Sequence, residues 1–239
     1  MTRVLIVLPS SSYRVADFVA SAKMLRAETV IATNAAQTMA GDMAYPLVRI
    51  DPRNPEWSAS RIVEFAQRFP LDAVVAADEE GVVMAAVAAR ELGLPHNPPE
   101  AVRVTRDKAA MRQVFADAAL PQPLFRVIGA DDDPVAACSE VGFPCVVKPV
   151  SLSASRGVIR VDGIAEVADT VARIRTITAE AGRDPGEPIL AESFVPGTEV
   201  ALEGLLVDGH LEVLALFDKP DPMNGPYFEE TILVTPSRL

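Results

Sequence analysis

Short apolar runs alternate with longer stretches of helical periodicity over the first hundred residues. A short run rich in Val, Leu, Ile and Ala predicts a buried strand, and apolar residues three or four positions apart predict a helix. The expected strands are 3–8, 29–32, 47–50 and 73–77. The expected helices are 15–26, 58–69 and 82–92. This alternation is typical of an α/β fold with a parallel sheet wrapped by helices.

The pattern changes after the segment Leu94-Pro95-His96-Asn97-Pro98-Pro99, which is the densest cluster of breaking residues in the chain. We place a domain boundary there, between residues 1–97 and 98–239. Further helices are expected at 99–105, 107–118, 134–141 and 164–179. Further strands are expected at 124–128, 144–149, 157–161, 188–194, 199–207 and 212–218. The last three strands are expected to form an antiparallel meander, because strong turn signals separate them.

The composition is that of a globular protein with an acidic surface. Apolar residues make up 49% of the 239 residues, and the formal net charge is −11. Such a chain repels a phosphate backbone, so we expect no nucleic-acid partner. No stretch approaches the roughly 20 apolar residues of a membrane span, so we expect no membrane partner and a cytoplasmic location. The two cysteines have no metal-binding spacing.

The turn after the first expected strand bears on the ligand of the N-terminal half. It reads Pro9-Ser10-Ser11-Ser12-Tyr13 and contains no glycine, so its backbone is unsuited to a close approach to a pyrophosphate. This argues against a nicotinamide-dependent dehydrogenase. We expect the serines to cap the following helix, with carboxylate binding as the alternative.

An acidic segment, Asp78-Glu79-Glu80, follows the fourth expected strand. Open α/β sheets bind ligands at the carboxyl ends of their strands, which favours a functional role for Asp78. The same acids would complement the dipole of the next helix, and this alternative stays open.

A lysine followed by a loop of small hydroxyl residues is the most informative pattern in the second half. Lys148 ends an apolar strand, which would bury its alkyl stem and direct its ammonium group. The following serine-rich loop closes at Gly157, and its hydroxyl and backbone N–H groups could surround phosphate oxygens. Positive charge beside phosphates is what phosphoryl transfer requires. A solvated lysine beside a flexible hairpin is the alternative.

Two further patterns accompany this loop. Lys108 opens a helix forty positions before Lys148. Glu192 lies near the end of an expected strand, before the turn at Pro196-Gly197, and Glu199 follows that turn. Backbone groups at such a junction can bind an adenine edge, and a nearby carboxylate can accept hydrogen bonds from ribose hydroxyls. A hairpin with solvated acids is the alternative.

The chain resembles the ATP-grasp superfamily in four motifs that occur in the family's order. They are Arg106-Asp107-Lys108, Val147-Lys148-Pro149, the serine-rich loop to Gly157, and the segment from Glu192 to Glu199. The members it looks most like are carboxylate–amine ligases related to L-amino-acid ligases. The resemblance covers most of the chain. It implies a parallel-sheet pre-ATP-grasp domain followed by an ATP-grasp α+β domain that is incomplete at its C-terminus.

The resemblance implies a phosphate-binding role for two lysines and one loop. Lys108 and Lys148 would contact the phosphates of ATP. The loop would close over them, through Ser151, Ser153, Ser155, Arg156 and Gly157. Arg156 departs from the family's pattern, in which small residues are usual at this position.

The resemblance also implies how the nucleoside is held. Glu192, Ser193 and Val195 would form the adenine-binding segment, mostly through backbone groups. Glu199 would accept hydrogen bonds from the ribose.

The implied activity is ATP-dependent ligation. The enzyme would activate a small carboxylate substrate as an acyl phosphate, which an amine co-substrate then attacks to form a C–N bond, with Mg²⁺ required beside the phosphates. Family members often form homodimers. A nucleotide-binding module without chemistry is the alternative.

The end of the chain precedes the segment where the family places its metal-binding carboxylates. We therefore expect this chain alone to lack the catalytic metal site, and we assign no catalytic residue and no metal ligand. Residues 228–231 are expected on a strand, where Glu229 and Glu230 are candidates for substrate contact.

Overall fold

The chain folds into two compact units, Met1–Arg106 and Asp107–Leu239, and each is described on its own. The structure is a computed structural model that describes residues 2–10, 12, 14–35, 47–228 and 230–239. The mixed α/β fold class is confirmed, with a parallel sheet in the first unit and antiparallel sheets in the second. The boundary between residues 97 and 98 stays a prediction. Within the described ranges, no helix is both long enough and apolar enough to cross a membrane.

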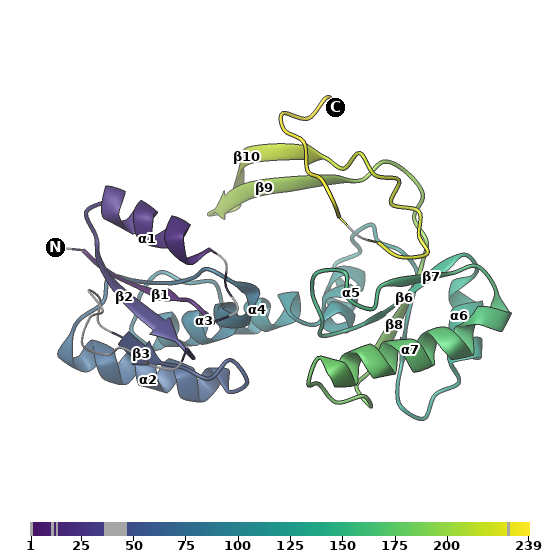
Figure 1. Ribbon diagram of the computed structural model, residues 1–239, viewed down its shortest axis with the longest axis horizontal. Coiled ribbons are helices and arrows are strands. Elements are labelled where there is room, and N and C mark those ends of the chain that lie inside the picture. The colour runs from purple at the N-terminus through teal and green to yellow at the C-terminus, as the bar shows by residue number, and fades with distance from the viewer. Residues whose placement is uncertain (1, 11, 13, 36–46, 229) are drawn as a thin grey trace. The chain divides into compact units, whose positions relative to one another are not determined.

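The first unit is built on a four-stranded parallel sheet in the order β3-β2-β1-β4 (Figure 1). The strands are β1 (Arg3–Val7), β2 (Glu28–Thr33), β3 (Leu47–Arg49) and β4 (Ala73–Ala76). Alternation along β1 sends Leu5 and Val7 to one face and Ile6 to the other, and all three are buried. The sheet therefore needs an apolar cover on both faces.

Helices provide that cover. They are α1 (Val15–Met24), α2 (Pro55–Arg68), η1 (Glu79–Gly81), α3 (Val82–Glu91) and α4 (Pro99–Thr105). α2 and α3 pack on the face of Leu5, where Ile62 and Met84 join its core. α1 packs on the opposite face, where Ala22 joins the cluster around Ile6.

The first helix begins without the serine cap expected from the sequence. Its N-cap residue is Arg14, and the described side chains provide no capping hydrogen bond. Ser12 Oγ instead accepts a hydrogen bond from the backbone N–H of Arg14 at 3.2 Å. Such a local turn competes with capping. Ser11 and Tyr13 lie outside the described residues.

The second unit contains a four-stranded antiparallel sheet in the order β5-β8-β6-β7. Its strands are β5 (Phe125–Ile128), β6 (Cys145–Pro149), β7 (Ile159–Val161) and β8 (Ile189–Ser193). The helices of this unit are α5 (Lys108–Asp117), α6 (Pro134–Val141), η2 (Ile164–Glu166) and α7 (Val167–Glu180). Cys138 of α6 and Ile174 of α7 pack against Val147 and Ala191 of the sheet, which places the core on one of its faces.

β9 (Val200–Val207) and β10 (His210–Asp218) form a separate two-stranded hairpin (Figure 1). Its turn is Asp208-Gly209, with φ angles of 49° and 79°, as a type I′ turn requires. The meander predicted from the sequence is therefore wrong where it pairs β8 with β9. Both edges of β8 are hydrogen-bonded to β5 and β6, so no edge is left for β9.

The segment expected as a strand at 228–231 does not form one in its described part. The nearby pairings are isolated bridges, Ile159 with Tyr227 and Asp218 with Val234. Glu229 lies outside the described residues. Glu230 is exposed to solvent apart from its ion pair with Lys219.

Gly81 lies at a tight contact between the first turn of α3 and the sheet. A Cβ atom at this position would lie 2.7 Å from Cγ1 of Val7 and 3.2 Å from Cβ of Ala76. Both neighbours belong to strands and cannot easily move away. We therefore expect Gly81→Ala to lower the free energy of unfolding by about 1–3 kcal/mol, measured by urea denaturation.

Gly163→Ala is the control for that substitution. A Cβ atom at Gly163 meets no other atom within 4 Å, so we expect a change within about 0.5 kcal/mol. Equal losses of stability in the two variants would contradict the packing described for Gly81.

Candidate functional site

Polar side chains gather on the face of the antiparallel sheet opposite to α6 and α7. Val147 pairs with Ile159 and with Ala191, and these three side chains are buried in the core on the helix side. Successive residues of a strand point to opposite faces. Lys148 and Glu192, each one position further along its strand, therefore project from the other face.

A buried carboxylate joins three elements on this face. Glu192 Oε2 lies 2.6 Å from Lys148 Nζ, and Glu192 Oε1 lies 2.5 Å from Nε of Arg112 on α5. The Glu192 side chain is 6% exposed, and each of the two cationic side chains is 15% exposed. Both carboxylate oxygens are thus neutralised by donors that are themselves largely buried, which makes these contacts charge-assisted hydrogen bonds.

Burial and ion pairing act on the Glu192 carboxyl in opposite directions. Burial raises its pKa, whereas the hydrogen bonds and charges of Arg112 and Lys148 lower it, and the net pKa lies below its usual value. Glu192 is therefore a carboxylate at neutral pH. Arg112, Lys148 and Glu192 together carry one positive charge in excess.

Lys108 lies at the start of α5, on the same side of the helix as Arg112. Residues four positions apart on a helix are neighbours on its surface. Asp107 caps the helix by accepting hydrogen bonds from the backbone N–H groups of Ala109 and Ala110. The Lys108 N–H donates to the Val150 carbonyl at 3.2 Å, and its Nζ donates to the Leu152 carbonyl. These bonds tie α5 to the segment after β6.

The serine-rich loop connects β6 to β7 and has an unusual backbone. Ala154, Ser155 and Gly157 have φ angles of 55°, 54° and 73°. A Cβ atom on Gly157 would also lie 3.2 Å from Pro149 Cδ, so both space and conformation favour glycine there. Backbone N–H groups in such turns can line a concave anion site.

The loop's other predicted residues differ in their surroundings. Ser151 Oγ donates a hydrogen bond to Glu187 Oε1 at 2.6 Å, so this hydroxyl is tethered at the base of the loop. Ser153 is half-buried, and its carbonyl lies 3.5 Å from Nε of Arg156. Arg156 itself is exposed. The loop thus presents one flexible cation and two half-buried serines, Ser153 and Ser155.

The segment after β8 exposes backbone groups. Ser193 is held at both ends, because its N–H donates to the Leu124 carbonyl and its Oγ accepts from the Leu124 N–H. Val195 is 65% exposed, and its N–H makes no hydrogen bond to any described residue. A planar ring with a hydrogen-bonding edge could pair with this backbone.

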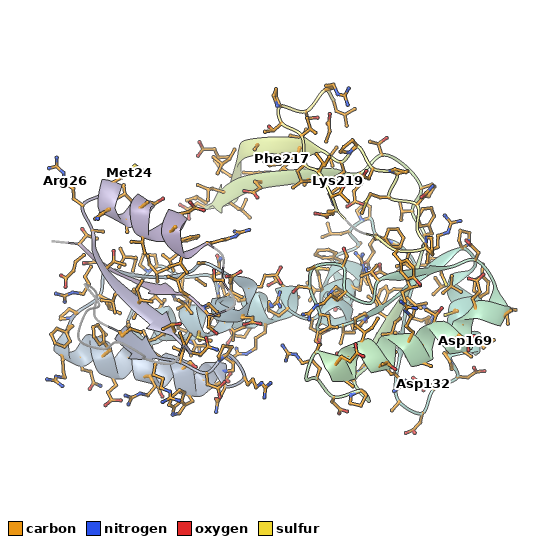
Figure 2. The ribbon with its side chains drawn as sticks, in the orientation of Figure 1. Met24, Arg26, Asp132, Asp169, Phe217 and Lys219 are labelled. Atoms are coloured by element: carbon orange, nitrogen blue, oxygen red, sulfur yellow. The ribbon has the colours of Figure 1, made fainter. Side chains whose placement is uncertain are left out.

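Glu199 lies in a second ion cluster, just before β9. Lys219, at the end of β10 (Figure 2), donates hydrogen bonds to both Glu199 and Glu230. The Lys219 side chain is 8% exposed. Burial lowers its pKa, but the bonds to the two glutamates outweigh burial and raise it. Lys219 therefore stays charged and holds the Glu199 carboxylate in place.

Arg112 and Lys219 were not among the residues predicted from the sequence. The signal for Arg112 was its position four residues after Lys108 on the same predicted helix. The signal for Lys219 was stronger, because a lysine at the end of an apolar strand and before a proline is the pattern that identified Lys148.

Asp78 was a further candidate and lies in the first unit. It precedes η1 without a capping hydrogen bond. Its Oδ2 is buried and has no hydrogen-bond partner among the described residues. Glu79, by contrast, is paired with Arg106. A functional role for Asp78 and a role in helix-dipole stabilisation both stay predictions.

Over the described ranges, no group of three or more His, Cys, Asp or Glu side chains is placed to hold a metal ion. The carboxylates of Glu192 and Glu199 are paired with lysine and arginine side chains. The arrangement as it stands is suited to binding a polyphosphate anion.

Two family models match the chain, one for each unit. The ATP-grasp N-terminal domain matches residues 19–96, and the ATP-grasp domain matches residues 141–239. Both matches belong to ATP-grasp proteins, and together they span most of the described chain. The chain belongs to the ATP-grasp family.

Several relatives of the chain are named as ligases. Alanine–anticapsin ligase of Bacillus subtilis (strain 168) is 30% identical over 212 residues, which cover 79% of this chain and 43% of that protein. D-alanine–D-alanine ligase of Laribacter hongkongensis is 33% identical over 123 residues, which cover 51% of this chain and 37% of that protein. The chain thus spans less than half of the length of these relatives.

Solved structures share the fold over the whole chain. The L-amino acid ligase from Bacillus licheniformis has a TM-score of 0.79 and 25% identity, covering 100% of this chain and 55% of that one. The ADP complex of an N5-carboxyaminoimidazole ribonucleotide synthetase has a TM-score of 0.71 and 16% identity, covering 100% of this chain and 58% of that one. At that identity the second similarity concerns the fold alone.

Removing the buried negative charge should destabilise the second unit. Glu192→Gln leaves Arg112 and Lys148 close together without a carboxylate, so we expect a loss of about 3 kcal/mol in the free energy of unfolding at pH 7. Because the pKa of Glu192 is lowered by folding, the parent keeps this stabilisation above the usual carboxyl pKa of about 4.3. It loses the stabilisation as the pH falls through the lowered pKa, and the variant should lack this pH dependence. Urea denaturation across this pH range measures both effects.

The exposed ion pair of Arg126 and Glu140 provides the matched control. Its side chains are 54% and 58% exposed, so Glu140→Gln should cost less than about 1 kcal/mol. A loss in Glu192→Gln no larger than in Glu140→Gln would show that the buried cluster does not stabilise the fold.

Proposed function

We propose that this chain is part of an ATP-dependent ligase that activates a carboxylate as an acyl phosphate for attack by an amine. The observation that carries the proposal is the buried cluster of Arg112, Lys148 and Glu192 on the face of the antiparallel sheet opposite to α6 and α7, with Lys108 one turn before Arg112 on α5. The names of the relatives support it, because alanine–anticapsin ligase and D-alanine–D-alanine ligase are named for joining amino acids or similar acids.

In this proposal Lys108 and Lys148 bind the phosphates, and the loop from Ser151 to Gly157 covers them. These two lysines and Arg112, less the charge of Glu192, leave two positive charges in excess in a chain of net charge −11. Arg112 would keep the Glu192 carboxylate neutralised while the Lys148 ammonium group donates a hydrogen bond to a phosphate oxygen. ATP supplies the phosphoryl group that makes the acid reactive.

The same proposal assigns the nucleoside to the segment after β8. The backbone of Ser193 and Val195 would bind the adenine edge, and Glu192 lies at the inner end of this segment. Glu199 would accept hydrogen bonds from the ribose hydroxyls. Lys219 would then act as a positioning residue, because it restrains the Glu199 carboxylate.

The proposal includes Mg²⁺, an acid and an amine as reaction partners and a homodimer, as the family resemblance implies, and the cytoplasmic location expected from the sequence. The described residues do not form a metal-binding group, so no residue of this chain is assigned to Mg²⁺ and no step is derived through it. The residues that select the acid and the amine are likewise left unassigned.

Calorimetric titration with a nonhydrolysable ATP analogue tests the phosphate site. Lys148→Ala removes one charge-assisted hydrogen bond to a phosphate, so we expect its Kd to rise about 10-fold or more. Lys108→Ala should behave in the same way. The two substitutions should weaken the binding of adenosine less, because adenosine has no phosphates.

Lys23→Ala is the matched control, because Lys23 is an exposed lysine in the first unit. Its Kd should equal that of the parent. Circular dichroism of each variant checks that it is folded. A folded parent that does not bind the analogue, or a Lys148→Ala variant that binds it as tightly as the parent, would refute the proposed site.

A further inference from the structure

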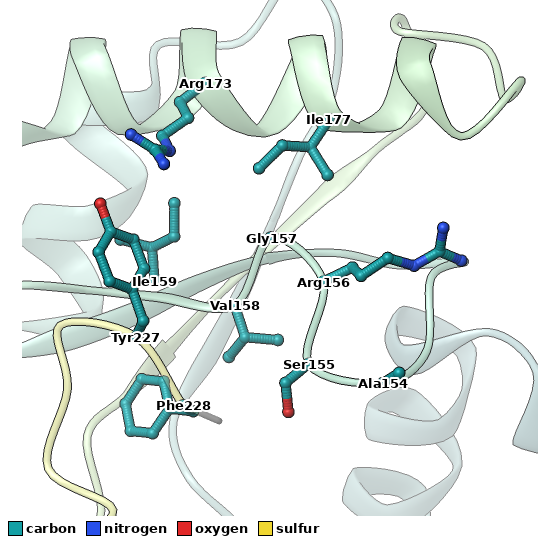
Figure 3. Close-up of a pocket in the computed structure, with 10 residues that line it drawn as sticks. All are labelled: Ala154, Ser155, Arg156, Gly157, Val158, Ile159, Arg173, Ile177, Tyr227 and Phe228. Atoms are coloured by element: carbon teal, nitrogen blue, oxygen red, sulfur yellow. The ribbon is translucent and has the colours of Figure 1, made fainter. Parts of the chain in front are cut away.

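A cavity of ≈ 370 Å³ lies beside the serine-rich loop (Figure 3). Residues 154–159 form one wall, Arg173 and Ile177 of α7 form the second, and Tyr227 and Phe228 form the third. Its volume is within the range of small-molecule sites, about 300–1,000 Å³. The proposed ligase reaction places no substrate or nucleotide in this cavity.

This cavity is separate from the cationic cluster of the candidate site. Ile159, in its wall, points into the same core as Val147, whereas Lys148 points to the opposite face of the sheet. Ile177 comes from α7, on the core side. The residues that line the cavity thus lie on the side of the sheet that α6 and α7 cover. The cavity and the candidate nucleotide site share only the loop.

One end of the cavity carries positive charge. The guanidinium of Arg173 lies over the ring of Tyr227, 5.3 Å from its centroid, and Figure 3 shows the two side chains pointing toward each other. None of the ion pairs of the described residues involves Arg173. In a chain of net charge −11, an arginine that is not paired with an acid is available for an external anion. The Arg156 side chain extends away from this end (Figure 3).

The rest of the lining is mainly apolar. Val158, Ile159, Ile177 and Phe228 surround the middle of the cavity. Buried contact with such side chains stabilises apolar groups but not a second charge.

We propose that this cavity binds a small apolar monocarboxylate. The planar guanidinium of Arg173 would hold the carboxylate through two parallel hydrogen bonds, with the Tyr227 hydroxyl as a further donor. The hydrocarbon body would contact Ile177 and Phe228. A phosphate dianion fits less well, because a single guanidinium converges on this end of the cavity.

Titration of the full chain with phenylacetate, followed by backbone amide NMR, tests this inference. We expect saturable shifts at Gly157, Val158 and Phe228 with a Kd on the order of 1 mM. Phenylacetamide, which has the same shape without the charge, should bind about 10-fold more weakly or worse. Arg173→Gln should raise the Kd of phenylacetate by a similar factor, and Tyr227→Phe should raise it by less.

Two controls separate this site from other effects. Arg68→Gln removes an arginine that lies over Phe69 at 5.8 Å in the first unit, so it should leave phenylacetate binding unchanged. Arg173→Gln should leave the Kd of the nonhydrolysable ATP analogue unchanged, so this inference and the proposed nucleotide site can fail independently.

Three results would overturn the inference. They are the absence of saturable shifts in the parent, equal affinity in the parent and in folded Arg173→Gln, and displacement of phenylacetate by equimolar inorganic phosphate.

Discussion

The buried carboxylate of Glu192 is the constraint on which the second unit depends. An ionised carboxylate that is 6% exposed costs several kcal/mol of free energy unless cations compensate it. Arg112 and Lys148 do so, and this requirement sets where α5 and the end of β6 must lie. Lys108 adds a second attachment through the carbonyls of Val150 and Leu152. The interaction that keeps the fold intact thus also holds three cationic side chains in one place.

Strand alternation separates two kinds of chemistry on one sheet. Val147, Ile159 and Ala191 close an apolar core against α6 and α7, while Lys148 and Glu192 form the polar face. The loop between β6 and β7 passes between these sides. Its left-handed residues let it turn sharply beside the cavity next to α7, and in the proposed function the same loop covers the phosphates. One short loop therefore takes part in two proposed sites of different ligand chemistry.

Local signals predicted the elements well, and long-range pairing was the part they could not predict. The helix over Pro134–Val141 begins where expected, because proline favours the first helical position. Lys148 was identified from its own strand, but Arg112, the other partner of Glu192, lies 80 residues from Glu192 in the sequence, and residue spacing carries no such information. The same limit explains the wrong meander, since β8 finds both its partners earlier in the chain. Ser12 failed as a cap because a closer backbone N–H competed for its hydroxyl.

In the proposed function, the buried carboxylate holds a preformed cationic site for a nucleotide. A crystal structure of the chain with ADP tests this most directly. We expect a phosphate oxygen within about 3 Å of Lys148 Nζ, with Arg112 still bound to Glu192 and the adenine edge at the Val195 backbone. ADP bound elsewhere, with the pair of Lys148 and Glu192 untouched, would contradict it.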